Sequence, residues 1–320
     1  MNSYDIWVNL LDLDVTVASG GTKLGGNIVA PLFETVELDL TGSGIFNGNS
    51  GAAAVQTAAG ATVNITGNAN MVTGLNFAAT GELLFNTNVT VDASAATGNL
   101  ALRGGNVGAT GSTLTGGTGA DVLIGSAGTD TLNGGAGADI LVGDLGAGNT
   151  ADVLTGGAGN DLFVVNAVAN LFNATFALAD TNTNNIERIT DFQGNGAQAG
   201  DTIVLNIAGL AVGNAFVGAA QGVINNVGQT ITVTPFTVGN ADNFAQLAAG
   251  LGGLQASVGG AGGVANIGDV TVSNGSLAGR YVVVDNDGVQ GLQLAAAGTD
   301  SIIALTPGTA ALNVNDFMIV

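Results

Sequence analysis

The chain has 320 residues, with 24 acidic side chains, four basic ones and no histidine, so its formal net charge is −20 at pH 7. This balance excludes nucleic acid as a partner, and membrane binding or insertion as well, since no basic patch can neutralise phosphates and no apolar run is long enough to cross a bilayer. The absence of cysteine excludes disulfides, thiolate catalysis and zinc sites built on sulfur.

Hydrophobic residues make up 46% of the chain, which is enough apolar surface for a folded core. The chain also has 54 glycines and only three prolines. Glycines spread among Val, Ile, Leu and Thr are typical of many tight turns between short strands. The sequence therefore predicts an all-β protein with one or two short helices. Divalent cations are the expected means of offsetting the repulsion between so many acids.

Residues 1–20 are unusually apolar for the end of a chain. Two roles stay open for this segment: it caps its own fold, or it docks onto a neighbouring subunit. It lacks a basic region, and Asp5, Asp12 and Asp14 interrupt its apolar run, so it does not resemble a Sec signal. Either the protein stays inside the cell, or it is exported by a route that does not read the N-terminus.

Short runs of alternating apolar and polar residues follow in residues 21–110. They recur roughly every 20–25 residues, which predicts the coils of a β-solenoid. The runs are residues 35–40, 61–66, 83–94 and 99–105.

A nine-residue repeat begins at Gly116 and ends at Val164. It reads GGTGADVLI, GSAGTDTLN and GGAGADILV, then GDLGAGNTADVLT, then GGAGNDLFV. Its aspartates are nine residues apart, except for one spacing of thirteen that places a four-residue insertion near residues 146–151. These aspartates are Asp121, Asp130, Asp139, Asp152 and Asp161.

Each copy predicts a glycine-rich turn followed by a short strand, because glycine lets the backbone bend until carbonyl oxygens point inward. Two copies make one coil of a parallel β-roll, so turns two copies apart stack about 4.8 Å from each other. Asp121, Asp139 and Asp161 then line one edge, and Asp130 and Asp152 line the other. Calcium takes six to eight oxygen ligands, and an ion between stacked turns would receive carboxylate oxygens from both. Stacked carboxylates repel one another without a cation, so we expect folding and calcium binding to be one event.

The repeat resembles the calcium-binding nonapeptide of the RTX family, G-G-x-G-x-D-x-U-x, in which U is a large apolar residue. The match covers about 50 of the 320 residues. Ser126 replaces a glycine, and the fourth copy departs further, with Asp144 in the second-glycine position and the insertion after it. The resemblance implies several calcium ions as cofactors. Besides the five aspartates, the predicted ligands in the repeats are Gly116, Thr118, Gly119, Gly125, Ala127, Gly128, Gly134, Gly135, Ala136, Gly137, Asp144, Gly156, Gly157, Ala158 and Gly159.

Two later segments extend the resemblance. Residues 187–205 look like the strand that often follows RTX repeats, which makes Asp191 and Asp201 further candidate ligands. Residues 280–320 look like the C-termini of RTX proteins, and the last five, from Asp316, are similar to the uncleaved signals of type I secretion substrates. Asp285, Asp287 and Asp300 form a further candidate calcium site in this region.

One helix is predicted at Ala241–Val258, with Asn240 as its cap. Its apolar face is expected to belong to the core and contains Phe244, Leu247, Leu251 and Leu254. The predicted organisation is an apolar segment at 1–20, a β-solenoid at 21–110, a calcium β-roll at 111–166 and a C-terminal β-rich domain at 167–320.

Residues 91–125 resemble the region before the repeats in bacterial RTX S-layer proteins. This resemblance favours a secreted structural protein of the bacterial cell surface that assembles with copies of itself, as an S-layer subunit or a filament, with a cell-surface polysaccharide as a second partner. Two alternatives stay open: the C-terminal module of a large RTX adhesin, and the tail of a secreted hydrolase. Catalysis by this chain is not expected, because nucleophilic triads need a histidine.

Overall fold

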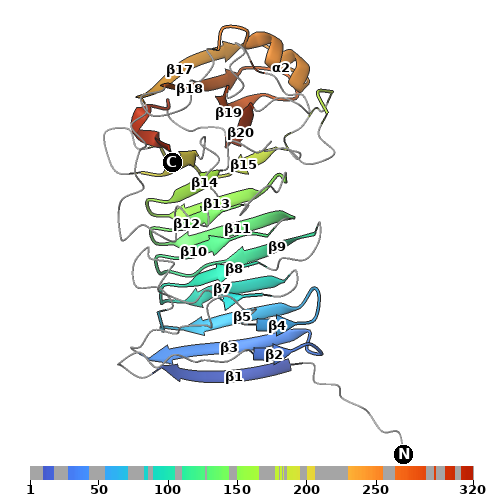
Figure 1. Ribbon diagram of the computed structural model, residues 1–320, viewed down its shortest axis with the longest axis vertical. Helices are drawn as coiled ribbons and strands as arrows, with labels where there is room; N and C mark the ends of the chain where they lie inside the picture. Colours follow the sequence, from blue (N-terminus) through green and yellow to red (C-terminus); the bar gives the residue numbers. More distant parts are fainter. Residues whose placement is uncertain are drawn as a thin grey trace, which may run out of the picture.

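The computed structural model of the protein describes residues 10–17, 28–42, 55–70, 83–85, 89–104, 110–126, 128–143, 150–165, 177–179, 181, 183, 186–194, 200–205, 230–254, 264–285, 292, 300–306 and 311–319. Within these ranges most elements are strands, stacked one above another along the long axis of the molecule (Figure 1). The N-terminal strands form one end of the stack, and the only described α-helix lies at the other end (Figure 1).

The described strands form two long sheets and one short one. In spatial order, the larger sheet contains β1 (Leu10–Val17), β3 (Thr35–Gly42), β5 (Thr62–Gly67), β7 (Thr90–Ala96), β9 (Thr110–Thr115), β11 (Thr129–Ala136), β13 (Val153–Ala158), β15 (Glu187–Ile189), β20 (Ser301–Leu305), β19 (Gly279–Val284), β18 (Val264–Val272) and β17 (Thr230–Val238). The smaller sheet contains β21 (Phe317–Ile319), β16 (Thr202–Leu205), β14 (Leu162–Val165), β12 (Ile140–Val142), β10 (Val122–Ile124), β8 (Ala101–Arg103) and β6 (Leu83–Leu84). The short sheet pairs β2 (Ile28–Ala30) with β4 (Val55–Thr57).

From β6 to β16 the chain alternates between the two long sheets, and each strand pairs in parallel with the strand one coil away. This is the winding of a parallel β-solenoid that continues as a β-roll, and it confirms the predicted fold class. The register keeps the apolar residue of each repeat in line: Leu132 lies beside Leu154, and Leu123 beside Leu141. These side chains are fully buried and form the thin core between the sheets.

The predicted domains share the two long sheets. β1 pairs with β3 over its whole length, so residues 10–17 belong to the larger sheet. At the other boundary, β13 pairs with β15 and β14 with β16, so both sheets run from the repeats into the C-terminal part. Among the described strands, antiparallel pairing occurs only among β18, β19 and β20, at the C-terminal end of the stack.

The helix differs from its prediction. It is α2 (Phe244–Gly250), and its N-cap is Asn243, whose side chain accepts the N–H of Gln246 at 3.0 Å. The predicted cap, Asn240, lies outside it, and so does Leu251, which forms the C-cap. Glycines at the end of the segment explain the early stop, because glycine disfavours a helix interior. The four apolar side chains predicted for one face are nevertheless buried in a second core beside β17–β20.

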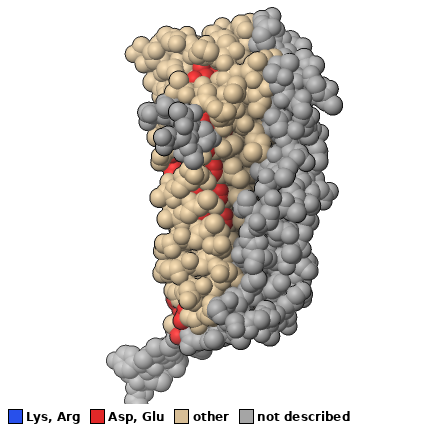
Figure 2. Space-filling model, turned by 90° about the vertical axis from the view of Figure 1, so that its left-hand side faces the viewer, with Lys and Arg blue, Asp and Glu red and all other residues tan. Residues whose placement is uncertain are grey.

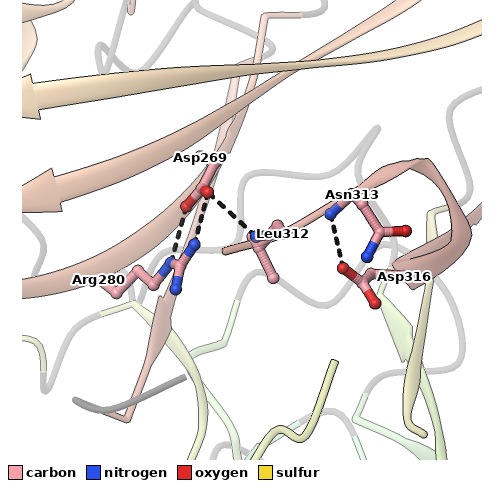
Figure 3. Close-up of polar contacts among 5 residues, drawn as sticks. All are labelled: Asp269, Arg280, Leu312, Asn313 and Asp316. Carbon is pink, nitrogen blue, oxygen red and sulfur yellow. Dashed lines mark hydrogen bonds and ion pairs between the residues drawn. The ribbon is translucent and has the colours of Figure 1, made fainter. Parts of the chain in front are cut away.

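Residues 311–319 contact both the antiparallel strands and the smaller sheet. Asp269 of β18 accepts hydrogen bonds from Nε (2.7 Å) and Nη2 (2.5 Å) of Arg280 in β19, and also from the N–H of Leu312 (3.2 Å) (Figure 3). A 3₁₀ turn, η1 (Val314–Asp316), follows, and Oδ2 of Asp316 accepts the N–H of Asn313 at 2.7 Å (Figure 3). β21 then pairs with β16 at the end of the smaller sheet.

Candidate calcium-binding edges

One row of aspartates lines the edge where the strands of the smaller sheet begin. Each aspartate directly precedes a strand, and its Oδ1 accepts a backbone N–H of the coil before it: that of Leu100 for Asp121 (2.8 Å), and that of the preceding row aspartate for the others. The N–H of Asp121 bonds to Asp139 (2.7 Å), that of Asp139 to Asp161 (2.9 Å), and that of Asp161 to Asp201 (3.0 Å). We call Asp121, Asp139, Asp161 and Asp201 the first row.

A second row lies where the strands of the larger sheet begin. Asp152 Oδ1 accepts the N–H of Asp130 at 2.8 Å, and Glu187 Oε2 accepts the N–H of Asp152 at 3.0 Å. We call Asp130, Asp152 and Glu187 the second row. The structure thus places the five repeat aspartates on the two edges that their spacing predicts, and adds Asp201 to one row and Glu187 to the other.

Figure 2 shows acidic side chains following the long axis on one face of the molecule, with no basic side chain on the described part of that face. The row aspartates are nevertheless buried. Their carboxylates lie inside the turns and satisfy backbone N–H groups there, so a metal ion would be held between turns.

The second carboxylate oxygen, Oδ2, accepts a hydrogen bond in some of these aspartates and none in others. Oδ2 of Asp121 accepts the N–H of Gly117 in its own turn, and Oδ2 of Asp130 accepts that of Ser126, both at 2.6 Å. Oδ2 of Asp139 and Oδ2 of Asp161 are buried and accept no hydrogen bond within the described part of the chain. A buried carboxylate oxygen without a donor is costly, and a hard cation such as calcium is a partner that suits it.

The first glycine of each repeat leaves the space that these carboxylate oxygens occupy. A side chain at Gly116, Gly125 or Gly134 would overlap Oδ2 of the aspartate in the same repeat and also a carbonyl oxygen of the next turn on the same edge. Carboxylate and carbonyl oxygens therefore converge at each of these turns. Both are ligand types that calcium takes.

The second and fourth glycines are required by the backbone. Gly135, Gly137, Gly157 and Gly159 have φ values of 101°, 141°, 99° and 150°, a region that other residues rarely adopt. A side chain at any of them would also overlap a carbonyl oxygen of the turn one coil below. Among the other predicted turn positions, Thr118, Gly119 and Gly128 lie between strands, Ala136 and Ala158 are the last residues of β11 and β13, and Ala127 and Asp144 lie outside the described residues.

Burial raises the pKa of aspartates in both rows. It raises the pKa of Asp139 from 3.8 to about 7, and the charges of Asp121 and Asp161 act in the same direction. Burial also raises the pKa of Asp121 and that of Asp201 to about 6, and it raises the pKa of Asp130 and Asp161. Without a cation, folding therefore makes these carboxyl groups harder to ionise. A bound divalent ion would reverse this effect.

The predicted ligands after the repeats lie in different parts of the structure. Asp191 joins the first row's last turns, where it accepts the N–H of Gly157 at 2.7 Å. Asp285 and Asp300 lie at the end of the β19–β20 pair, where Val284 lies opposite Ser301, and β20 is the strand beside Glu187 of the second row. Both carboxylates are fully buried. Asp287, the third predicted member of that site, lies outside the described residues.

Glu187 is the row member that the sequence reasoning missed. It stands 35 residues after Asp152, so no nine-residue spacing points to it. A signal was present, because Glu187-Arg188-Ile189 keeps the acid–x–apolar order of the repeat without its glycines. Asp201, followed by Thr202 and Ile203, keeps the same order.

No three acidic side chains among the described residues surround a single point as a ready metal cage. A site within the repeats would therefore combine one or two carboxylates with backbone carbonyl oxygens. Such an arrangement leaves coordination positions for the carbonyls that the glycine turns direct inward.

Comparison with protein families gives a match confined to this region. Residues 115–149 and 147–167 match the model of the RTX calcium-binding nonapeptide repeat, four copies. Residues 115–167 therefore carry RTX calcium-binding repeats. Calcium is the cofactor of these repeats, and the repeats are typical of secreted proteins. The RTX resemblance and the calcium prediction are thereby confirmed, whereas the likeness to S-layer proteins stays a prediction.

A separate comparison with curated proteins found no match to the chain. The described residues contain no helix that is long and apolar enough to cross a membrane. RTX repeats occur mostly in structural proteins and in some enzymes, so the repeats alone leave the activity of the chain open.

Proposed function

We propose that the protein is a secreted structural protein of the bacterial cell surface, whose copies assemble into an S-layer or a filament when calcium is present. The observation that carries this proposal is the open end of the larger sheet. β1 is the terminal strand of that sheet and pairs with β3 alone among the described strands. A stack of coils that ends in an unpaired strand edge can be extended by a coil from another copy.

Calcium would control assembly through the fold. The two rows hold buried carboxylates that repel one another, so the roll is expected to be stable only when cations lie between its turns. Extracellular calcium modules bind at roughly 10⁻⁴–10⁻³ M, far above cytosolic calcium. The chain would then fold, and its copies would assemble, only outside the cell.

Light scattering and negative-stain microscopy test the proposal. The purified protein should form ordered sheets or filaments in millimolar calcium and lose them in excess EGTA. Leu10→Lys places a charge on the terminal strand and should weaken assembly without unfolding the protein. Leu178→Lys is the matched control, because Leu10 and Leu178 are 42% and 41% exposed. A calcium-folded chain that stays monomeric at high concentration would exclude self-assembly.

A second candidate is a calcium-binding and export module of a larger RTX adhesin or hydrolase. The confinement of the family match to residues 115–167 favours it, because the same repeats occur in proteins of different activities. The mass of the protein isolated from its native source separates the two candidates. A native protein much larger than 31.0 kDa would favour the module.

A cell-surface polysaccharide is the second partner we propose. A hollow of about 350 Å³ lies where β15, β19 and β20 meet, and its walls include Arg188, Thr190, Tyr281 and Thr306. Hydroxyl groups, a guanidinium and an aromatic ring are groups that sugars contact. Arg188→Ala should reduce co-sedimentation with purified cell-wall polysaccharide, and unchanged co-sedimentation would argue against this hollow.

A further inference from the structure

The N-terminal end of the stack leaves part of its core uncovered. Leu11 of β1 lies level with Val36 of β3 and Val63 of β5. Both valines are fully buried, whereas Leu11 is only partly buried. On the other side of the stack, Ile28 of β2 lies beside Val55 of β4, and again only the inner residue is fully buried. Within the described residues, the terminal coil therefore has no coil beneath it to complete its core.

Exposed apolar side chains surround this end. The described residues include five large apolar side chains that are exposed, and three of them, Leu10, Val29 and Leu32, belong to the terminal coil. Val29 is 59% exposed, and Leu32, in the turn after β2, is 82% exposed. Among the described strands, β1 pairs only with β3 and β2 only with β4. Exposed apolar side chains beside open strand edges are the features of a docking surface.

The opposite end of the larger sheet is closed. Its terminal strand, β17, contains Pro235, which has no backbone N–H to offer to an added strand. The helix α2 lies at the same end (Figure 1), and its Phe244 and Leu247 are fully buried in the second core. β1 contains no proline. A second copy that extends the larger sheet beyond β1 is therefore best able to do so with its own β1.

We propose that the N-terminal end of the protein docks onto the same end of a second copy, so that the two β1 strands pair antiparallel across a two-fold axis. The proposal rests on the self-assembly proposed above, and it names the surface and the symmetry of one contact. An interface that uses the same surface on both copies is closed and joins two chains only. Growth into a sheet or a filament then requires a second kind of contact elsewhere on the surface.

The acids of the terminal strands make this pairing depend on the ions in solution. Asp12 lies on the exposed face of β1, beside Glu37 of β3. The two-fold axis brings the same acids of the second copy close, and like charges on neighbouring strands repel each other. Salt screens this repulsion between exposed charges. Pairing should therefore be weakest in EGTA at low salt, and stronger in millimolar calcium.

Distances between labels on the two copies test the symmetry. The chain contains no cysteine, so one introduced cysteine carries one nitroxide label per copy. Asp12→Cys and Asp92→Cys place labels at exposed positions of one cross-strand row, three strands apart. In a two-fold pair, pulsed electron paramagnetic resonance should give a distance roughly 25–30 Å longer at Asp92 than at Asp12, because the difference is twice three strand spacings of about 4.8 Å. In a head-to-tail stack, both positions should give the same distance.

A charge at the rim of the interface tests the contact itself. Val29→Glu adds a carboxylate to the terminal coil at an exposed position, where the fold of the single chain should tolerate it. Val314→Glu is the matched control, because Val314 is 49% exposed and lies in η1 of the C-terminal part. Sedimentation equilibrium of the full-length protein in millimolar calcium should show the dissociation constant of the pair raised tenfold or more by Val29→Glu and unchanged by the control. Equal effects of the two substitutions would argue against docking through this end.

The outcomes separate this proposal from the proposed function. If the copies associate and both labels give the same distance, association is head to tail, and the two-fold pairing is wrong while self-assembly stands. If the unlabelled chain stays monomeric at high concentration in calcium, self-assembly itself fails, and something other than a second copy covers the terminal coil. If Asp92→Cys does not fold, Asn64→Cys replaces it, with an expected difference of about 19 Å for a position two strands from Asp12.

Discussion

Asp139→Asn should have opposite effects on the metal-free and the calcium-bound protein. Asp139 lies in the middle of the first row, between Asp121 and Asp161, and its Oδ2 is buried without a hydrogen bond in the described structure. Asparagine keeps an acceptor for the N–H of Asp121 and removes the charge. The substitution therefore separates the cost of burying a carboxylate from its value as a calcium ligand.

The magnitude in the metal-free state follows from the pKa of Asp139. Burial raises it from 3.8 to about 7. Each unit corresponds to about 1.4 kcal/mol, so an ionised Asp139 costs the metal-free fold up to about 4 kcal/mol above neutral pH. Screening by water at the edge of the turn reduces this to about 2–3 kcal/mol. Asp139→Asn should remove that cost and make the roll more stable in EGTA.

With calcium the sign reverses, because Asp139 can contribute a carboxylate to the gap on either side. A tenfold loss of affinity for each ion amounts to about 1.4 kcal/mol per ion. Urea denaturation followed by circular dichroism, in EGTA and in saturating calcium, measures both effects. Glu34→Gln is the control, since Glu34 is exposed in the turn before β3. Equal destabilisation of Asp139→Asn in both conditions would refute the reasoning.

Three further predictions follow from the same contacts. In EGTA, stability should fall as pH rises from about 4 to 7, because the pKa of Asp121, raised to about 6, and that of Asp139, raised to about 7, let the folded state hold protons that the unfolded chain releases. The affinity for calcium should rise over the same pH range. Thermal melts at pH 4.5 and 7.5, with and without calcium, would detect both trends, and melting temperatures that do not depend on pH would contradict them. Gly157→Ala should cost about 2 kcal/mol or more in urea denaturation, because Gly157 has φ of 99° and no room for a side chain, whereas Gly252→Ala, with open space around it, should cost little; equal costs would speak against the turn geometry. Asp269→Asn should cost about 3 kcal/mol, because it removes the negative charge that pairs with the partly buried Arg280, and the loss should be the same in EGTA and calcium.

The sequence predicts most of the repeat region because its period is fixed. Nine residues make one turn and one strand, so the spacing alone assigns Asp121 and Asp139 to one edge and Asp130 to the other. The observed hydrogen bonds join residues of the same edge: Asp121 to Asp139, and Asp130 to Asp152. The four-residue insertion leaves the register of β11 and β13 intact.

The remaining features depend on contacts that no local pattern contains. Glu187 reaches its row because β15 pairs with β13 across an interval of 35 residues. Asp269 finds Arg280 through an antiparallel pair, and Leu312 through a segment 43 residues further along the chain. The helix cap was predicted three residues too early because Asn240 and Asn243 are equally good caps in isolation, and tertiary packing selects between them.

Along the first edge, asparagine side chains in the solenoid are followed by aspartates in the roll. Beneath Asp121, amides serve the stacked backbone: Asn70 accepts the N–H of Asn99, and Asn99 accepts the N–H of Ala120, both at 2.9 Å. These bonds carry no charge, so the coils that contain them can stack without a cation. From Asp121 onward the same kind of bond is made by carboxylates, whose mutual repulsion must be offset. The solenoid and the roll thus share one winding and one core, and differ along this edge in the charge of the side chains that accept the backbone N–H groups. For this reason we expect the stability of the roll to depend on calcium more than that of the solenoid.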